Sequence, residues 1–91
     1  MPERVILTAV GQNRPGVLAE ITAAIAKLQG NVLDISQKMM QNYFNLIMLV
    51  DISGAKADFA RFKAKLEATG AKGGYAVSVQ HEEVFHYMHR V

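Results

Sequence analysis

The stretch of residues 11–18 restricts the possible folds of this chain most strongly, because it joins an extended pattern to a helical one. Residues 5–10 are apolar or β-branched at every position, which is typical of a central strand buried on both faces. Residues 17–29 then place apolar side chains at helical spacing, and Gly30 is predicted to end this helix in a left-handed conformation. The chain therefore begins with a strand, a tight turn and a helix.

The turn carries residues that suit a ligand-binding helix N-terminus. Asn13 is predicted to cap the helix, since its side-chain oxygen can accept from the free N–H groups of the first turn. Pro15 suits that first turn, while Gly11 and Gly16 lack a Cβ that would hinder the turn or an approaching molecule. With the charge of Arg14 added, the junction favours an anion such as a carboxylate or phosphate, although most turns of this kind bind nothing.

The composition indicates one small domain over residues 1–91. A chain of this length buries only about 60–65% of its unfolded surface, so association with a second copy would add to a thin core. The chain has no cysteine, no signal peptide and no membrane-spanning apolar run, which predicts a cytoplasmic protein without a membrane partner. Its net charge of +2 comes from basic side chains interleaved with acidic ones, which argues against a nucleic-acid partner.

Two further strands are predicted after the first helix, joined as a hairpin by Gln41 and Asn42. Residues 31–41 alternate apolar and polar side chains, and this polar character suits an edge strand. Residues 43–52 are more apolar. Their helix-covered face is predicted to carry Phe44, Leu46, Met48 and Val50, and their open face Ile47 and Leu49. An open face this apolar indicates contact with another chain.

The remaining chain predicts a second helix, a last strand and a tail. The helix is expected over residues 55–69, opened by Ser53 and Gly54 and ended by Gly70. Its buried stripe would consist of Phe59, Phe62 and Leu66. The strand covers residues 75–80, and the tail over residues 81–91 is expected to dock through short helical turns that carry Val84, Phe85 and Met88.

This order of elements, β-α-β-β-α-β, predicts an α+β ferredoxin-like sandwich with residues 4–80 as its core. Right-handed crossovers place both helices on one face of a four-stranded antiparallel sheet. The expected spatial order is fourth, first, third and second strand. The second strand, which is the most polar, then lies at an edge.

These motifs resemble those of the ACT domain, a small-molecule-sensing module attached to many enzymes and regulators of amino-acid metabolism. The family's first turn reads glycine, any residue, aspartate, arginine, proline, glycine, valine or leucine, leucine. Residues 11–18 follow this pattern except that Asn13 replaces the aspartate. The hairpin over residues 32–51 and the tail over residues 79–91 resemble stand-alone, uncharacterised ACT proteins of bacteria and archaea, related to the repressor-type accessory protein of the glycine cleavage system.

The resemblance implies a non-catalytic regulatory module that binds an amino acid or similar metabolite without a cofactor or metal. It also implies a dimer or higher oligomer, and a regulated metabolic enzyme or regulator as a partner. The effector would lodge between subunits and shift their arrangement through its differential affinity. An amide at residue 13 is weaker than a carboxylate toward a ligand's ammonium group. The implied site consists of Gly11, Gln12, Asn13, Arg14, Pro15, Gly16, Val17 and Leu18 from one subunit and Asn31, Val32 and Asp34 from the other.

Three other functions are also compatible with parts of the sequence. Arg14 and Asn13 near a helix N-terminus suggest an acylphosphatase-like enzyme, but the glycine-rich phosphate loop of that family is missing. RNA binding would need bases stacked on Tyr43 and Tyr75, which are predicted on the open face without flanking basic residues. A metal site in the tail, or merely a polar helix face there, would involve His81, Glu82, Glu83, His86 and His89.

Overall fold

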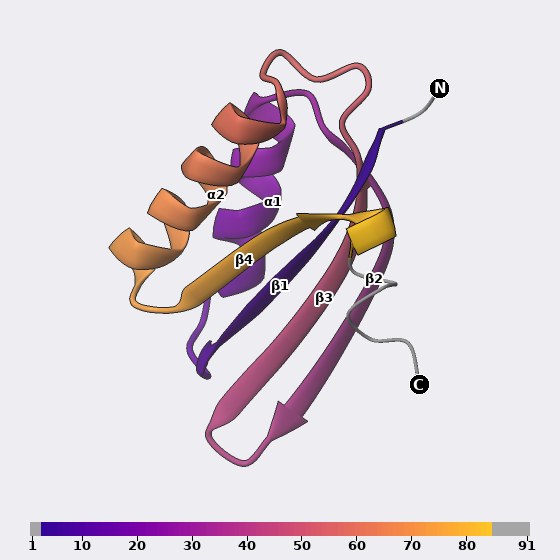
Figure 1. Ribbon diagram of the computed structural model, residues 1–91. Helices are drawn as coiled ribbons and strands as arrows, with labels where there is room; N and C mark the ends of the chain where they lie inside the picture. Colours follow the sequence, from indigo (N-terminus) through magenta and orange to yellow (C-terminus); the bar gives the residue numbers. More distant parts are fainter. Residues whose placement is uncertain (1–2, 85–91) are drawn as a thin grey trace.

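The structure, a computed structural model, describes residues 3–84 and has the predicted βαββαβ order. Two helices cover one face of a four-stranded sheet, and neither of them lies on the other face (Figure 1). This arrangement confirms the ferredoxin-like α+β prediction. The elements are β1 (Arg4–Gln12), α1 (Val17–Lys27), β2 (Asn31–Met40), β3 (Tyr43–Asp51), α2 (Phe59–Gly73) and β4 (Ala76–His81).

The strands lie in the order β2-β3-β1-β4 and all neighbouring pairs are antiparallel, as predicted. The central strand β1 pairs with β3 from Arg4 opposite Asp51 to Gln12 opposite Tyr43. Because both crossovers are right-handed, the two helices come to lie on the same face. The edges are therefore β2 and β4.

The core lies between the sheet and the helices. In β3 the buried side chains alternate with exposed ones, and the predicted inward set of Phe44, Leu46, Met48 and Val50 is confirmed. Residues Phe62 and Leu66 of α2 close the core from the helix side, also as predicted. The remaining large members are Val5, Leu7, Val17, Ile21, Ile25, Ile52, Tyr75 and Val79.

The edge strand β2 is exposed at every residue from Asn31 to Met40. A register shift between Val32 and Asp34 places Leu33 in a bulge, which bends the strand and increases its twist. The hairpin turns at the predicted residues, where Gln41 adopts a positive φ of 56°. The strand exposes several apolar side chains to solvent: Val32, Leu33, Ile35, Met39 and Met40.

The start of α2 differs from the prediction, because Ser53 and Gly54 do not open the helix. The Asp51 carboxylate accepts hydrogen bonds from the backbone N–H and the hydroxyl of Ser53, and this holds the chain in a turn. The helix begins only at Phe59, where the Asp58 carboxylate accepts from the N–H of Arg61 at 3.0 Å.

The predicted helix ends at Gly30 and Gly70 are wrong. Gln29 takes the left-handed conformation after α1, with φ of 60°, and Gly74 takes it after α2, with φ of 86°. Gly30 and Gly70 serve close packing instead, because added Cβ atoms would lie 2.9 Å from Ile25 Cγ2 and 2.6 Å from Val77 Cγ2, respectively. Tertiary packing, and not a left-handed backbone, requires glycine at these two positions.

The last strand begins and ends one residue later than predicted and closes with His81. The His81 ring stacks on Phe59 with centroids 3.8 Å apart, and its Nε2 lies 2.9 Å from a Glu3 carboxylate oxygen. The tail contacts predicted for Phe85 and Met88 lie outside the described residues.

Candidate functional site

The turn between β1 and α1 is built differently from the prediction. Gly16, not Asn13, is the N-cap of α1: its φ is 88°, and its carbonyl accepts from the N–H of Glu20 at 2.9 Å. No side chain of the described residues caps this helix. Asn13 is too far back along the chain to reach the first turn, and its own N–H donates to the carbonyl of Asn42 in the β2–β3 hairpin at 2.6 Å. Pro15 also precedes the helix instead of starting it.

Asp58, the N-cap of α2, and Asn13, which caps no helix, are expected to respond differently to replacement by alanine. Asp58→Ala removes a cap hydrogen bond and should lower the free energy of unfolding by about 0.5–2 kcal/mol. Asn13→Ala should change it by less than about 0.5 kcal/mol, because the backbone hydrogen bond persists. Urea unfolding followed by circular dichroism would measure both. A larger loss for Asn13→Ala than for Asp58→Ala would show that the α1 turn is capped by Asn13 after all.

Gly11 lies in β1 where β4 begins, and close packing explains the glycine. A Cβ there would lie 2.6 Å from the Cβ of Tyr75 and 3.3 Å from the Phe44 ring. Gln12 is exposed beside Tyr43, Val17 is buried in the core, and Leu18 is 37% exposed. The turn is thus fixed to the core by its two ends, and its middle residues face solvent.

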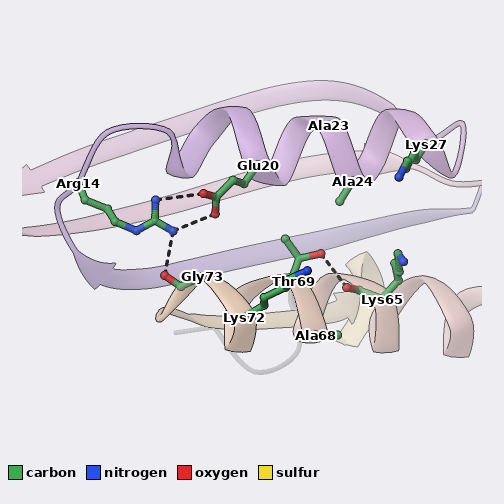
Figure 2. Close-up of a pocket in the computed structure, with 10 residues that line it drawn as sticks. All are labelled: Arg14, Glu20, Ala23, Ala24, Lys27, Lys65, Ala68, Thr69, Lys72 and Gly73. Atoms are coloured by element: carbon green, nitrogen blue, oxygen red, sulfur yellow. Dashed lines mark hydrogen bonds and ion pairs between the residues drawn. The ribbon is translucent and has the colours of Figure 1, made fainter.

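A hollow of about 820 Å³ opens between α1 and α2 beside this turn (Figure 2). Its floor consists largely of small side chains, and four of its rim residues are cationic, with a single carboxylate among the lining residues. We call this hollow the interhelical groove. Its lining residues are Arg14, Glu20, Ala23, Ala24, Lys27, Lys65, Ala68, Thr69, Lys72 and Gly73.

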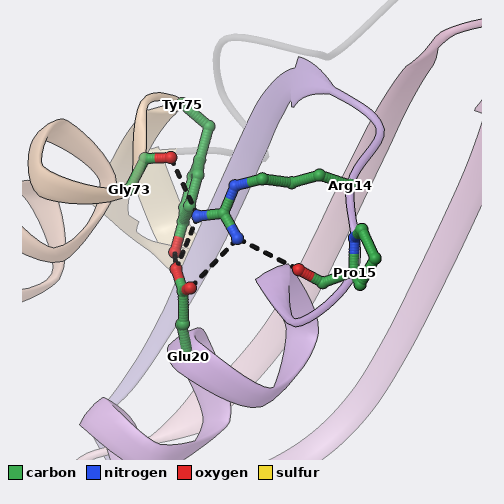
Figure 3. A network of polar contacts seen from close by, with 5 residues as sticks. All are labelled: Arg14, Pro15, Glu20, Gly73 and Tyr75. Atoms are coloured by element: carbon green, nitrogen blue, oxygen red, sulfur yellow. Dashed lines mark hydrogen bonds and ion pairs between the residues drawn. The ribbon is translucent and has the colours of Figure 1, made fainter.

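Arg14 occupies one end of the interhelical groove and is held in a network of polar contacts (Figure 3). Its guanidinium donates to both carboxylate oxygens of Glu20 at 2.9 and 3.1 Å. It also donates to the Gly73 carbonyl at 2.8 Å and lies 5.7 Å from the Tyr75 ring centroid. The Tyr75 hydroxyl donates to Glu20 at 3.1 Å. The Arg14 charge, predicted to attract an anion at the turn, is therefore already paired.

The network shifts the proton affinity of its members. The hydrogen bond from Arg14 is the largest cause that lowers the pKa of Glu20, so this carboxyl stays ionised at neutral pH. The hydrogen bond to Glu20 likewise raises the pKa of Arg14. Burial, reinforced by the hydrogen bond to Glu20, raises the pKa of Tyr75 to about 12. At neutral pH the network therefore consists of one ion pair and one neutral phenol.

The raised pKa of Tyr75 predicts a stability loss in alkali. The neutral phenol is favoured by folding, so its contribution is complete below the ordinary value of 10.0 and disappears as pH rises through about 12. The phenolate absorbance of the parent minus that of Tyr75→Phe should therefore titrate with a midpoint near 12. A difference midpoint near 10 would mean that Tyr75 is not held by burial and Glu20.

The three residues predicted at the start of the second strand lie far from the turn within one subunit. Asn31 is opposite Asp51, at the end of the sheet where β1 begins, whereas the turn follows the end of β1. The bulge also divides the set between two faces. Val32 pairs with buried Val50 on the helix side, and Asp34 pairs with Leu49 on the open side. Only contact with another subunit could bring Val32 to the turn.

The structure also bears on the RNA and metal alternatives. Tyr75 is 7% exposed and packs edge-on against Phe44, so its prediction as an open-face aromatic is wrong. Tyr43 alone of this pair is exposed. Within residues 3–84 no group of three histidine or acidic side chains could hold a metal ion, and His86 and His89 lie outside that range. No helix in the same range is long and apolar enough to cross a membrane.

Three residues that contact Arg14 were not predicted from the sequence: Glu20, Gly73 and Tyr75. Glu20 offered a weak signal, because a carboxylate six residues after an arginine can fold back onto it across a helix start. Gly73 and Tyr75 offered no signal, since their hydrogen bonds to Arg14 and Glu20 join residues separated by about sixty positions. Their proximity depends on the antiparallel placement of α1 and α2 over β1 and β4.

The sequence and the fold were compared with known proteins. A UPF0237 protein of Methanocaldococcus jannaschii is 51% identical over 88 residues, which make up 97% of this chain and 98% of that protein. An ACT domain protein from Streptococcus pneumoniae superposes with a TM-score of 0.81 and 30% identity, covering 93% of this chain and 96% of that one.

A crystal structure described as a putative glycine cleavage system transcriptional repressor shares the fold with a TM-score of 0.79 at 23% identity, over 89% of this chain and 46% of that one. The ACT domain family itself matches residues 3–80, the sheet and helices described above. The chain therefore belongs to the ACT domain family, as the resemblance of its first turn, hairpin and tail indicated.

Proposed function

We propose that this chain is a regulatory module that binds an amino acid or similar small metabolite between two subunits, beside the turn of residues 11–18. ACT domains are small-molecule-binding regulatory modules and commonly oligomerise. The observation that carries the finer proposal is the exposed edge strand β2, which pairs with β3 on one side and with no other strand of residues 3–84, and which exposes apolar side chains from Val32 to Met40. Such an edge is a template for pairing with another strand.

A two-fold axis through the middle of β2 would bring the two halves of the site together. Antiparallel pairing of two β2 strands would set Asn31 and Val32 of the partner subunit opposite Met40 and Met39. These methionines lie opposite Tyr43 and Phe44, which in turn lie opposite Gln12 and Gly11 at the start of the turn. The beginning of one β2 would therefore reach the end of the sheet that carries the other subunit's turn.

The turn offers three kinds of contact to a small ligand. The first N–H groups of α1 have no side-chain cap among the described residues, and the positive end of the helix dipole favours a carboxylate there. The Asn13 side chain makes no hydrogen bond within residues 3–84 and can accept from an ammonium group. Leu18 adds an exposed apolar surface. A carboxylate beside an ammonium group is the arrangement found in an amino acid.

A screen of the twenty amino acids and of simple carboxylate and phosphate anions by thermal shift would test this function. A ligand at 100 times its Kd should stabilise the folded state by about 2.7 kcal/mol. The same ligand should alter the sedimentation coefficient of the oligomer. A chain that sediments as a monomer at micromolar concentration, with or without ligands, would disprove the inter-subunit site.

A variant pair would locate the ligand at the β2 edge. Val32→Asp places a carboxylate on the helix side of the edge and should abolish both the oligomer and the thermal shift. Ser78→Asp puts the same charge on the opposite edge strand, β4, and should leave both unchanged. If Val32→Asp dissociates the oligomer but the thermal shift persists, the ligand binds within a single subunit.

A further inference from the structure

We propose that the interhelical groove docks an acidic amphipathic helix of another protein. The groove is lined by residues of the turn, α1 and α2 and by none of β2, and it does not require an effector at the turn (Figure 2). Three properties identify the occupant: the small side chains of the groove floor, the spacing of the lysines along its rim, and the basic charge of this chain's own helix α2.

The small side chains on the floor of the groove allow the backbone of a partner helix to approach closely. Ala23 and Ala24 of α1 and Ala68 and Thr69 of α2 line it, and Figure 2 shows Ala24 and Thr69 in the space between the two helices. Packed helices lie about 8–10 Å apart, and the shorter values require small side chains at the contact. A third helix can therefore settle between α1 and α2 and place its own larger apolar side chains on the alanines.

The cations of the groove repeat at helical spacing. Lys65 and Lys72 are seven residues apart on α2, which corresponds to two turns or about 10.5 Å along the axis. A helix lying along α2 repeats its own residues i and i+7 at the same distance, so two carboxylates at these positions would meet both lysines. Lys27 of α1 adds a third cation on the other rim.

These three lysines are available to a partner. None of them forms an ion pair with any residue in the range 3–84, whereas Arg14 at the end of the groove is neutralised by Glu20. Long lysine stems can also cover apolar surface of a docked helix while their charged ends reach its carboxylates. The rim is thus cationic and unpaired over most of its length.

Neither α2 nor residues 85–91 of this chain supply a complementary acidic segment. On α2, the basic residues Arg61, Lys63, Lys65 and Lys72 outnumber a single carboxylate, Glu67, so the same helix of a second copy would repel the groove. Residues 85–91 contain no aspartate or glutamate. The acidic occupant therefore belongs to a different protein.

The probe is a synthetic helical peptide with leucines at i, i+4 and i+7 along one stripe and glutamates seven residues apart on each flank. Its binding to the isotope-labelled full chain would be followed by amide chemical shifts and fluorescence anisotropy. We expect shifts centred on Ala23, Ala68 and Thr69. The double variant Lys65→Glu with Lys72→Glu should weaken binding at least tenfold and should gain affinity for a peptide in which lysines replace the glutamates.

Matched variants separate docking from general charge attraction. Lys56→Glu with Lys63→Glu makes the same change in net charge outside the groove and should retain parent affinity. Ala68→Leu fills the floor and should block the peptide, while Ala60→Leu, exposed on the same helix outside the groove, should not. Failure of the acidic peptide to bind the parent, or equal binding by both lysine variants, would overturn the proposal. Binding of inorganic tripolyphosphate at these residues without the peptide would also overturn it, in favour of a small-anion site.

Discussion

Replacement of Phe62 by alanine is expected to lower the free energy of unfolding by about 3–5 kcal/mol, the largest single effect in this chain. Phe62 is 0% exposed and is the largest of the fully buried side chains. It packs from α2 toward the connection between α1 and β2, where its ring would lie 3.3 Å from a Cβ at Gly30. Its loss leaves a cavity between the two layers that hold the core together.

The effect should be visible as a fall in melting temperature of more than about 12 °C, since 1 kcal/mol corresponds to about 4–8 °C in a domain of this size. Phe59→Ala is the matched control, because Phe59 lies one turn earlier on α2 but is only partly buried, against the His81 ring. Phe59→Ala should lower the free energy of unfolding clearly less than Phe62→Ala does. Both variants should be compared at equal protein concentration, because association also adds to stability. Equal losses would contradict the orientation of α2.

The second large effect is expected at Gly16, whose φ of 88° forces the left-handed conformation on any replacement. Gly16→Ala should cost about 1–2 kcal/mol, and a β-branched residue should cost more. Steric crowding does not cause this loss of stability, because an added Cβ would lie 4.0 Å from its nearest neighbours, Arg14 and Glu20. Gly16→Asn should recover part of the loss, because asparagine tolerates this conformation.

Two other glycines make this experiment specific. Gly74 has nearly the same φ of 86° with no atom within 4 Å of an added Cβ, so Gly74→Ala should show the same backbone cost far from the ligand contacts. Gly54 is equally open without a positive φ, and Gly54→Ala should stay within about 0.5 kcal/mol of the parent. Thermal-shift assays on these variants should show effector stabilisation reduced only at Gly16. Reduction at Gly74 as well would show that lost stability, and not lost contact, explains it.

The arrangement of the sheet could be predicted from the sequence because it depends on local alternation. The period of two in residues 43–51 assigns Phe44, Leu46, Met48 and Val50 to one face, and a register slip by one residue would expose all of them. The apolar character of residues 5–10 likewise requires a central position for β1. The first turn was recognisable because its residues are adjacent in the chain.

The ends of the helices could not be predicted, because several residues compete for each cap. Ser53 lies in a turn in which it donates to Asp51, and Asp58 is the residue that caps α2. Gly30 and Gly70 resemble helix terminators, yet they are required where α1 meets β3 and where α2 meets β4. A glycine looks the same in the sequence whether it frees the backbone or makes room for a neighbour.

The candidate site depends still more on tertiary structure. The family, the strand order and the turn that carries Arg14 could be predicted from the sequence. Only the packing of α2 against β4 brought the Gly73 carbonyl and the Tyr75 hydroxyl to the Arg14–Glu20 pair. The bulge after Val32, which sends Asp34 to the other face, and the interhelical groove arise in the same way. These features depend on residues that are distant in the chain. The side-chain periods of two residues in a strand and 3.6 in a helix carry no information about such contacts.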